Sequence, residues 1–392
     1  MIAHRGSTIK FPENTIPAFK ESLNTDGANS LAVDLSLTKD RKIVLWHDWD
    51  LTSPIAMVRK EKGEEVSKFK PYGPPLVELR VQKKVSEFDF SEFIDKHGYK
   101  DKITNVKTNF KIPTFQDLIE WAVKQNKLKL LILKLRAPID EKYLIPVMLE
   151  EIRRTVRKIS PPPRFQFVIS VPNKEGLELL RSPDGNFLFS FDRELPPSGI
   201  VNYHRFTTVP VAMNFKNKFS SIGFPRYSSA TESNLDPWAV YKFVLTLDLK
   251  LRDNYKNATS NYINIISWTF NDEKKIKCLI NLGVDGIVTD KPKILREIAL
   301  NMGKVLQLSK DKGLPPIYNI GSGEEVTIRK LAHMLCHVVG YQGKLSFDES
   351  RPDGTPRKLL DSSLMLQIGW TAHTSLEEGL SLTYADYVES HA

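Results

Sequence analysis

The sequence predicts an α/β fold in which a (β/α)8 barrel is followed by a small C-terminal α/β lobe. Short apolar runs alternate with amphipathic helical patterns over about 300 of the 392 residues, and such alternation is typical of a parallel sheet with crossover helices. A segment of this length fits a (β/α)8 barrel. Because composition changes near residue 305, we expect a barrel over 1–303, a linker over 304–316 and a lobe over 317–392.

The alternation is clearest between residues 1 and 170. Apolar residues three and four positions apart, such as Ile16, Phe19 and Leu23, indicate helices, and short apolar runs indicate buried strands. Met1 stands only two residues before Ala3, so we expect a clipped first strand and an imperfect barrel seam. We expect strands at 1–3, 31–35, 42–46, 128–135 and 165–170, and helices at 15–24, 115–123 and 139–158.

Two stretches of the predicted barrel have a less regular pattern. Residues 49–110 are charged and contain Pro71, Pro74 and Pro75, so we expect an irregular insertion over one face of the barrel. Residues 196–262 interleave basic and aromatic side chains without a clear period. In the rest of the chain we expect strands at 187–191, 263–269, 286–288, 317–320 and 344–347, and helices at 175–181, 273–282, 293–301, 328–339 and 362–368.

The composition favours a globular protein with an anionic ligand. Lysine and arginine outnumber aspartate and glutamate by 56 to 47, which favours phosphates, but the basic residues are scattered and predict no nucleic acid partner. No apolar run approaches the roughly 18 residues of a membrane span, and the start lacks a signal-peptide pattern. Cys278 and Cys336 suggest neither a disulfide framework nor a zinc site, so we expect a reducing, cytoplasmic setting.

Two histidines are the strongest candidates for catalytic residues. His4 and His47 lie 43 residues apart, each after an apolar run, with Asp34 between them. Barrel enzymes keep their catalytic groups at strand ends, and a histidine pair can divide acid and base work on one leaving group. Taken one at a time, either residue is better explained as an ordinary loop or strand-end histidine, and only the whole set of residues favours a catalytic pair.

Motifs at both ends of the predicted barrel resemble those of the glycerophosphodiester phosphodiesterase family. The resemblance covers residues 1 to about 300, and the motifs occur in the family's order. They are His4-Arg5-Gly6, Pro12-Glu13-Asn14-Thr15, Ala18-Phe19, Gly27-Ala28, Asp34, Thr38-Lys39-Asp40, His47-Asp48, Ile112-Pro113-Thr114, Trp268-Thr269-Phe270-Asn271 and residues 283–292.

The resemblance implies a TIM barrel that cleaves a small phosphodiester such as glycerophosphocholine. It assigns His4 to the base or nucleophile side and His47 to the general acid, with Arg5 as a phosphate contact. It also implies a divalent cation, Ca²⁺ or Mg²⁺, that holds the phosphate, with Asp34 and Glu13 on the cation side. Such a site meets the charge that develops on the phosphoryl oxygens with fixed positive charge.

The sequence departs from the family pattern at the metal site. Ala32 stands where the family has the glutamate of its Glu-x-Asp pair, and Lys134 and Arg136 align with the family's Glu-x-Lys. Hard cations need several oxygen ligands, so either the protein is a pseudoenzyme or Lys134 pairs with Asp34 and replaces the metal, with Lys134 and Arg136 contacting the phosphate. We expect weakened or lost hydrolysis; the alternative is an inactive protein that binds phosphodiesters or GDP-sugars.

The C-terminal segment has a separate resemblance, to the end of GDP-L-fucose synthase, an extended short-chain dehydrogenase. The matching residues are 318–328, 351–361 and 368–370. The family's Rossmann half has no counterpart here, so we expect neither NADP binding nor reductase activity. Arg357 and Lys358 are candidate contacts for a phosphate or nucleotide sugar; a solvated basic turn explains them equally well.

Overall fold

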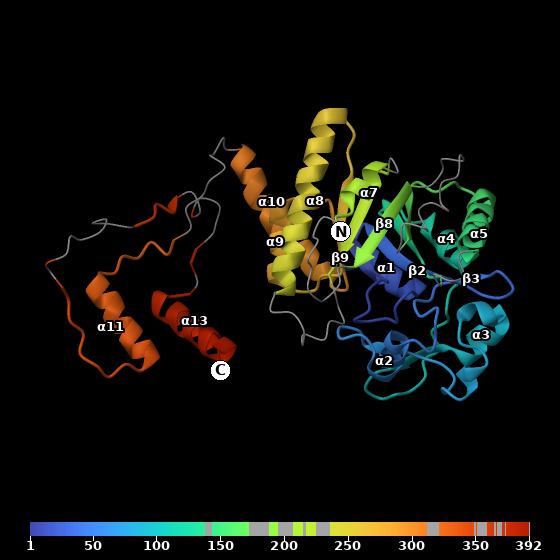
Figure 1. Cartoon of the computed structure of the whole chain (residues 1–392), viewed down its shortest axis with the longest axis horizontal. Coiled ribbons are helices and arrows are strands. Elements are labelled where there is room, and N and C mark those ends of the chain that lie inside the picture. Colours follow the sequence, from blue (N-terminus) through green and yellow to red (C-terminus); the bar gives the residue numbers. More distant parts are fainter. Residues whose placement is uncertain are drawn as a thin grey trace. The chain divides into compact units, whose positions relative to one another are not determined.

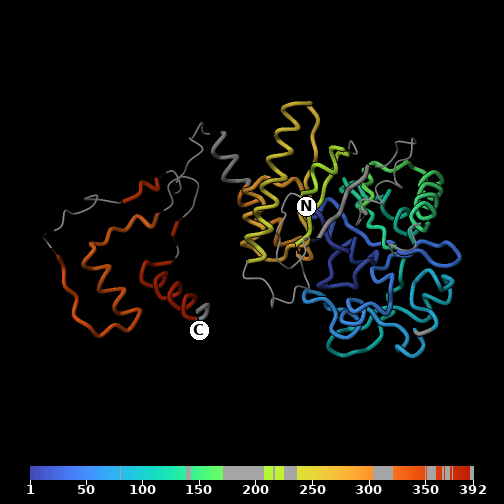
Figure 2. The backbone as a smooth tube through the Cα atoms, viewed as in Figure 1, coloured from blue at the N-terminus to red at the C-terminus, as the bar shows by residue number. Residues whose placement is uncertain are grey.

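The computed structural model divides into two compact units, Met1–Ala299 and Leu300–Ala392. It describes residues 1–137, 143–171, 188–194, 207–214, 217–224 and 236–311 and, further on, 321–348, 350, 359–363, 366, 371–372 and 374–391; the remainder is grey in Figure 2. Of the expected elements, the helix at 175–181 and the strand at 317–320 lie outside these residues.

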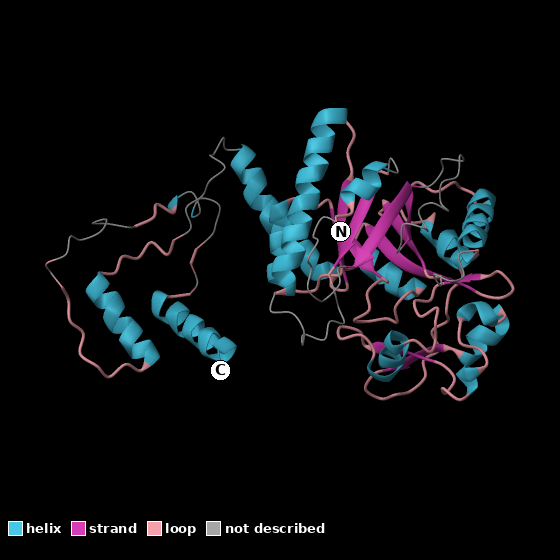
Figure 3. Ribbon diagram, viewed as in Figure 1, coloured by secondary structure: helices cyan, strands magenta, loops and turns pink. Residues whose placement is uncertain are grey.

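The first unit is a closed parallel barrel. Each of its described strands pairs in parallel with the next, and the last strand pairs with the first. Figure 3 shows the strands together in the middle of this unit with helices around them. In the order of pairing they are β1 (Ile2–His4), β2 (Ser30–Leu37), β6 (Leu130–Leu135), β7 (Gln166–Val171), β8 (Leu188–Glu194), β9 (Phe219–Gly223), β10 (Asn264–Trp268) and β11 (Gly286–Thr289).

The expectation of an imperfect seam was wrong. Although β1 is only 3 residues long, it pairs on both sides: Ile2 lies beside Val288 of β11 and beside Ser30 of β2. A short strand closes a barrel when both neighbours are in register, because its backbone groups are then satisfied on both edges.

Helices surround the strands, most of them at the predicted places (Figure 1). Thr15 caps the first helix and Thr114 the next, the latter through a capping box with Asp117. The last helix continues to Asp311, into the range that was predicted as a linker. The helices are α1 (Ile16–Asn24), α4 (Phe115–Ala122), α5 (Leu144–Lys158), α7 (Val209–Asn214), α8 (Pro237–Thr259), α9 (Glu273–Leu282) and α10 (Pro292–Asp311).

The inward-facing side chains of the barrel strands show which site residues also point inward. One buried cluster joins inward side chains of several strands, including Ala32 of β2 and Ile132 of β6, which are register partners. Side chains two positions apart share a face of a strand. Asp34 and Lys134, also register partners, therefore lie on the inward face, one step nearer the carboxyl-terminal mouth.

The insertion is ordered, so the expectation of an irregular segment was wrong. It begins after β3 (Ile43–Val44), which is antiparallel to β2, and its apolar cluster centres on Trp46, which packs against Phe93 and Tyr99. The predicted strand at 42–46 is accordingly shorter and outside the parallel barrel. The insertion contains α2 (Pro54–Lys62), β4 (Phe69–Tyr72), 3-10 turns at Glu78–Arg80 and Val85–Glu87, α3 (Phe90–Lys96) and β5 (Gly98–Asp101).

Among the described residues of the second unit that follow α10, the helices α11 (Ile328–Val339) and α13 (Leu376–His391) contact each other. The expected helix at 328–339 is confirmed, whereas residues 344–347 form a loop and not the expected strand. Among the residues that the structure describes, no helix is long and apolar enough to cross a membrane.

Candidate active site

The site lies where β1, β2 and β6 end. His4 is the last residue of β1, Asp34 lies on β2, and Arg136 follows β6 directly. The chain turns sharply after β1, with positive φ at Arg5 (56°) and Gly6 (90°). A Cβ at Gly6 would lie 2.7 Å from the Ala18 carbonyl carbon, so glycine at this position lets the loop pack against α1.

A cleft of about 260 Å³ opens at this mouth. It brings together five of the residues predicted from the sequence, whereas Glu13 and Asp34 lie buried beneath it. Side chains that line the cleft include His4, Arg5, His47, Lys134, Arg136 and Trp268.

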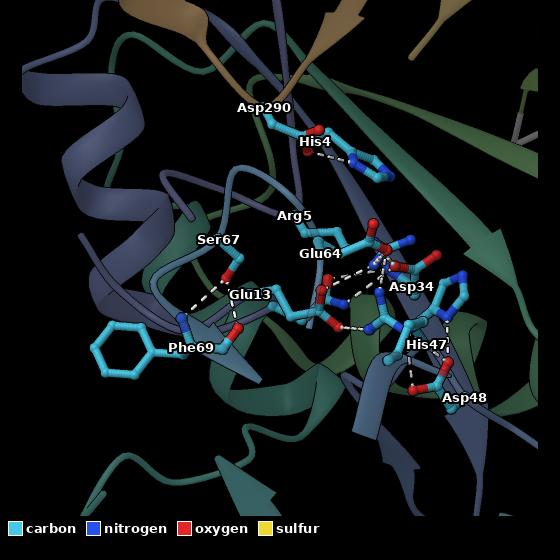
Figure 4. A network of polar contacts seen from close by, with 12 residues as sticks. His4, Arg5, Glu13, Asp34, His47, Asp48, Glu64, Ser67, Phe69 and Asp290 are labelled. Carbon is cyan, nitrogen blue, oxygen red and sulfur yellow. Dashed lines mark hydrogen bonds and ion pairs between the residues drawn. The ribbon is translucent and has the colours of Figure 1, made fainter. Parts of the chain in front are cut away.

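Each histidine is held by a carboxylate. His4 Nδ1 lies 2.7 Å from Asp290 Oδ1, and His47 Nδ1 lies 2.6 Å from Asp48 Oδ1. Figure 4 shows these pairs on opposite sides of Arg5 and Asp34. A carboxylate on Nδ1 fixes the tautomer with Nδ1 protonated, so that Nε2 is the nitrogen suited to proton transfer.

Two arginines neutralise Asp34, which is fully buried. Arg5 Nε lies 2.8 Å from Oδ2, and both Nε and Nη2 of Arg136 lie 2.8 Å from Oδ1. Burial alone would raise the pKa of the Asp34 carboxyl, but Arg136 and Arg5 more than offset that and hold the pKa well below its ordinary value. Asp34 is therefore ionised and already paired with cations.

Arg136 pairs with Asp34, a contact that the sequence analysis did not predict. Lys134 Nζ lies 4.1 Å from the centre of the Trp268 ring, a cation–π contact, and its pairing with Asp34 stays a prediction. Arg136 reaches the carboxylate because its side chain ends in a planar fork that can place two nitrogens on one oxygen. Lys134 remains at the cleft, with its charge beside the aromatic wall.

The structure adds Arg59 on α2 and its partner Glu64, which the sequence analysis missed. Arg59 Nε donates to both oxygens of Asp48 at 3.0 and 3.1 Å, and its other nitrogens bond to Glu13 and Glu64. Arg5 Nη1 also donates to Glu13, at 2.8 Å. No motif in the sequence singled out Arg59, because it stands in the segment that was predicted to be irregular.

His47 is neutral in the absence of a ligand. Burial, reinforced by Arg5, Arg136 and Arg59, holds the pKa of its imidazole well below the ordinary value of 6.5. The neutral ring is the base form. The charge of a bound phosphodiester would oppose the effect of these arginines.

A parallel barrel whose mouth carries two histidine–aspartate pairs and a row of cations is suited to a phosphorylated ligand. Comparison with known families agrees: residues 4–169 and 202–294 match the glycerophosphoryl diester phosphodiesterase family, and the chain belongs to that family. The family expected from the motifs is confirmed.

Solved structures agree with the fold. A putative glycerophosphoryl diester phosphodiesterase from Silicibacter pomeroyi is 19% identical, with a TM-score of 0.57 over 77% of this chain and 93% of that chain. A glycerophosphodiester phosphodiesterase from Parabacteroides distasonis gives a TM-score of 0.50 at 17% identity, over 77% and 97%. At these identities the likeness shows the barrel fold alone, and it confirms the predicted fold class.

Curated relatives are GDP-L-fucose synthases, and they match a shorter stretch of the chain. GDP-L-fucose synthase 1 of Arabidopsis thaliana is 39% identical over 142 residues, 35% of this chain and 42% of the relative. Putative GDP-L-fucose synthase 2 of the same plant is 56% identical over 72 residues, 18% of this chain and 22% of the relative. The chain thus spans less than half the length of these relatives. Arg357 and Lys358 lie outside the described residues, and their ligand-binding role stays a prediction.

The family implies a divalent cation, but the side chains present do not fit one. Both Asp34 oxygens and both Glu13 oxygens already bond to arginines. Ala32 supplies no oxygen ligand, and Lys134 places a positive charge where a ligand would stand. Calcium and magnesium need several oxygen ligands that are not already neutralised. Among the described residues, no group of three or more His, Cys, Asp or Glu is arranged to hold a metal.

Proposed function

We propose that this protein binds a small phosphodiester of the glycerophosphocholine type in the cleft and hydrolyses it slowly, without a divalent cation. The observation that carries the proposal is the pair of histidine–aspartate contacts facing one cleft whose fixed cations include Arg136 and Lys134. Guanidinium and ammonium groups can stabilise phosphoryl oxygens electrostatically, but they lack the Lewis acidity of a metal. Slow turnover is the expected consequence.

The histidines divide the proton transfers. His47, neutral at rest, accepts a proton from the attacking water. The new P–O bond forms as the bond to the leaving alcohol breaks, and His4, held by Asp290, gives that oxygen its proton. This order reverses the roles expected from the resemblance, because the arginines around His47 disfavour its charged form in the ligand-free protein.

The test is hydrolysis of glycerophosphocholine followed by ³¹P NMR, with EDTA in one sample and Ca²⁺ or Mg²⁺ in another. We expect the same slow release of glycerol phosphate in both samples. His4→Ala or His47→Ala should each reduce the rate by about 10²- to 10⁴-fold, the usual contribution of one acid or base. Turnover that depends on added metal would contradict the proposal.

A non-catalytic binding protein is the second candidate. The observation in its favour is the replacement of metal ligands at Ala32 and Lys134 in a cleft whose other family residues are retained. Calorimetric titration with glycerophosphocholine, and separately with GDP-mannose as a GDP-sugar, distinguishes the two functions. Binding without any product in the NMR assay would favour the binding protein.

A further inference from the structure

Arg59 is the most enclosed cation of the site, and it belongs to the insertion. Its side chain is 1% exposed, although only Ala56 and Arg59 of the 9 residues of α2 are buried. The three nitrogens of its guanidinium contact three carboxylates, those of Asp48, Glu13 and Glu64.

The three carboxylates come from separate segments of the chain. Glu13 lies in the loop after β1, Asp48 follows β3, and Glu64 follows α2. Carboxylates buried together repel one another and are costly unless a cation pairs with them. A single planar group with several donors meets this requirement.

The arrangement performs the structural work of a divalent cation. A metal ion would join acidic side chains from several loops and place a fixed positive charge beside the phosphate site. Here Arg59 joins the same kind of side chains, and Arg5 donates to Glu13 and Glu64 from the other side at 2.8 and 3.4 Å. Arg59 also holds both oxygens of Asp48, the residue that contacts His47.

We propose that Arg59 is a built-in replacement for a divalent cation that would join Glu13, Asp48 and Glu64, and that its removal leaves a carboxylate cage able to bind Ca²⁺. That the cage acts beside a bound phosphodiester rests on the proposed function. That Ca²⁺ can take the place of the Arg59 guanidinium does not. Hydrolysis is therefore left out of the test, and failure of one proposal is distinguishable from failure of the other.

The test compares the full-length wild type with Arg59→Gln. The thermal midpoint of each is measured in EDTA and in Ca²⁺, and Ca²⁺ binding is titrated by calorimetry. Wild type should bind no Ca²⁺ and keep its midpoint. Arg59→Gln should melt lower in EDTA and gain about 5 °C or more at a Ca²⁺ concentration of roughly 100 times its dissociation constant. Arg59→Lys, which keeps one positive charge, should respond less than Arg59→Gln.

Arg252→Gln is the matched control. Arg252 on α8 is also buried and ion-paired, with Asp253 and Asp285, away from the cleft. The Arg252→Gln variant should have a lower thermal midpoint than wild type, and Ca²⁺ should not change that midpoint. Stoichiometric Ca²⁺ binding by wild type, or no Ca²⁺ response in folded Arg59→Gln, overturns the proposal.

If Arg59→Gln folds in neither buffer, Arg59→Gln/Glu64→Gln is measured in the same way. This double variant removes one positive and one negative charge, so the net charge of the cage stays that of wild type. It should fold and bind Ca²⁺ through the remaining carboxylates, about tenfold more weakly than an intact cage because one charged ligand is lost. Absence of binding in the folded double variant also overturns the proposal.

Discussion

Asp34 shows how much of this site is decided by the neighbours of one side chain. It keeps the family's carboxylate, yet Arg5 and Arg136 occupy its oxygens. A buried carboxylate needs compensation, and two guanidinium groups supply it permanently. The retained carboxylate therefore orients cations rather than a metal.

Gly6 is the residue at which the turn after β1 is most constrained. Its φ is +90°, and a Cβ added to it would lie 2.7 Å from the Ala18 carbonyl carbon. We expect Gly6→Ala to lower the free energy of unfolding by about 2 kcal/mol or more, because backbone strain and steric overlap add. Urea unfolding of wild type and Gly6→Ala measures this change in free energy. Gly283 has φ of +84° with open space around it, so Gly283→Ala should cost only about 1 kcal/mol; equal losses would contradict the steric argument.

Two histidines, the buried His97 and the partly buried His47, make stability depend on pH. Burial, with smaller effects of Lys60 and Lys96, lowers the pKa of His97 to about 4, and that of His47 is also well below 6.5. The unfolded chain therefore binds protons at a higher pH than the folded chain. The free energy of unfolding should be greatest above pH 6.5 and fall as pH drops towards 4, by up to about 1.4 kcal/mol per pH unit for each histidine.

Urea unfolding at several pH values between 4 and 7.5 measures this dependence. His97→Leu removes one of the two groups, so its curve should be flatter than that of wild type in the same range. Parallel curves for the two proteins would show that His97 does not contribute.

At the scale of elements, the insertion matters because its apolar core anchors the loop that carries His47. Trp46 precedes His47 and packs against Phe93, His97 and Tyr99. We expect Trp46→Ala to cost about 3–5 kcal/mol of stability and to weaken phosphodiester binding, because the loop that carries His47 loses its anchor. Unfolding by urea and calorimetric titration with glycerophosphocholine measure the two effects.

Trp121→Ala is the control for Trp46→Ala. Trp121 on α4 is half-buried and packs against Phe19, on the helical side of the barrel. Its loss should lower stability while leaving the affinity for glycerophosphocholine unchanged. Equal loss of affinity in both variants would mean that stability, and not the anchoring of His47, controls binding.

At the scale of the whole molecule, every residue of the candidate site comes from the first unit. All barrel strands and the cleft lie within Met1–Ala299, and α10 ends at Asp311. A chain that ends at Asp311 should therefore fold, melt within about 3 °C of the full chain's barrel transition and bind glycerophosphocholine with the same affinity. Calorimetric melting and titration test this. A truncated chain that folds but no longer binds would show that the second unit contributes to the site.

Elements with a strong local pattern could be predicted from the sequence. The strands β2 and β6 are short apolar runs, and α4 has both a capping box and an apolar stripe. The residues of each element are therefore enough to predict its secondary structure. By contrast, β9 and α8 fall in a stretch without a clear period. The insertion was mistaken for irregular chain because its core joins residues far apart, such as Trp46 and Tyr99, and no window of local sequence contains that contact.

The sequence by itself determined the family, the barrel, the two histidines and the departures at Ala32 and Lys134, because motif order and strand periodicity are written along the chain. Only the tertiary structure decided which cation meets each carboxylate. In the sequence Lys134 was the expected partner of Asp34, Arg136 was an expected phosphate contact, and nothing linked Arg59 to Asp48. Side-chain length, guanidinium geometry and the closing of the insertion over the barrel mouth selected Arg136 and Arg59, since ion pairing depends on distances that the linear order does not contain.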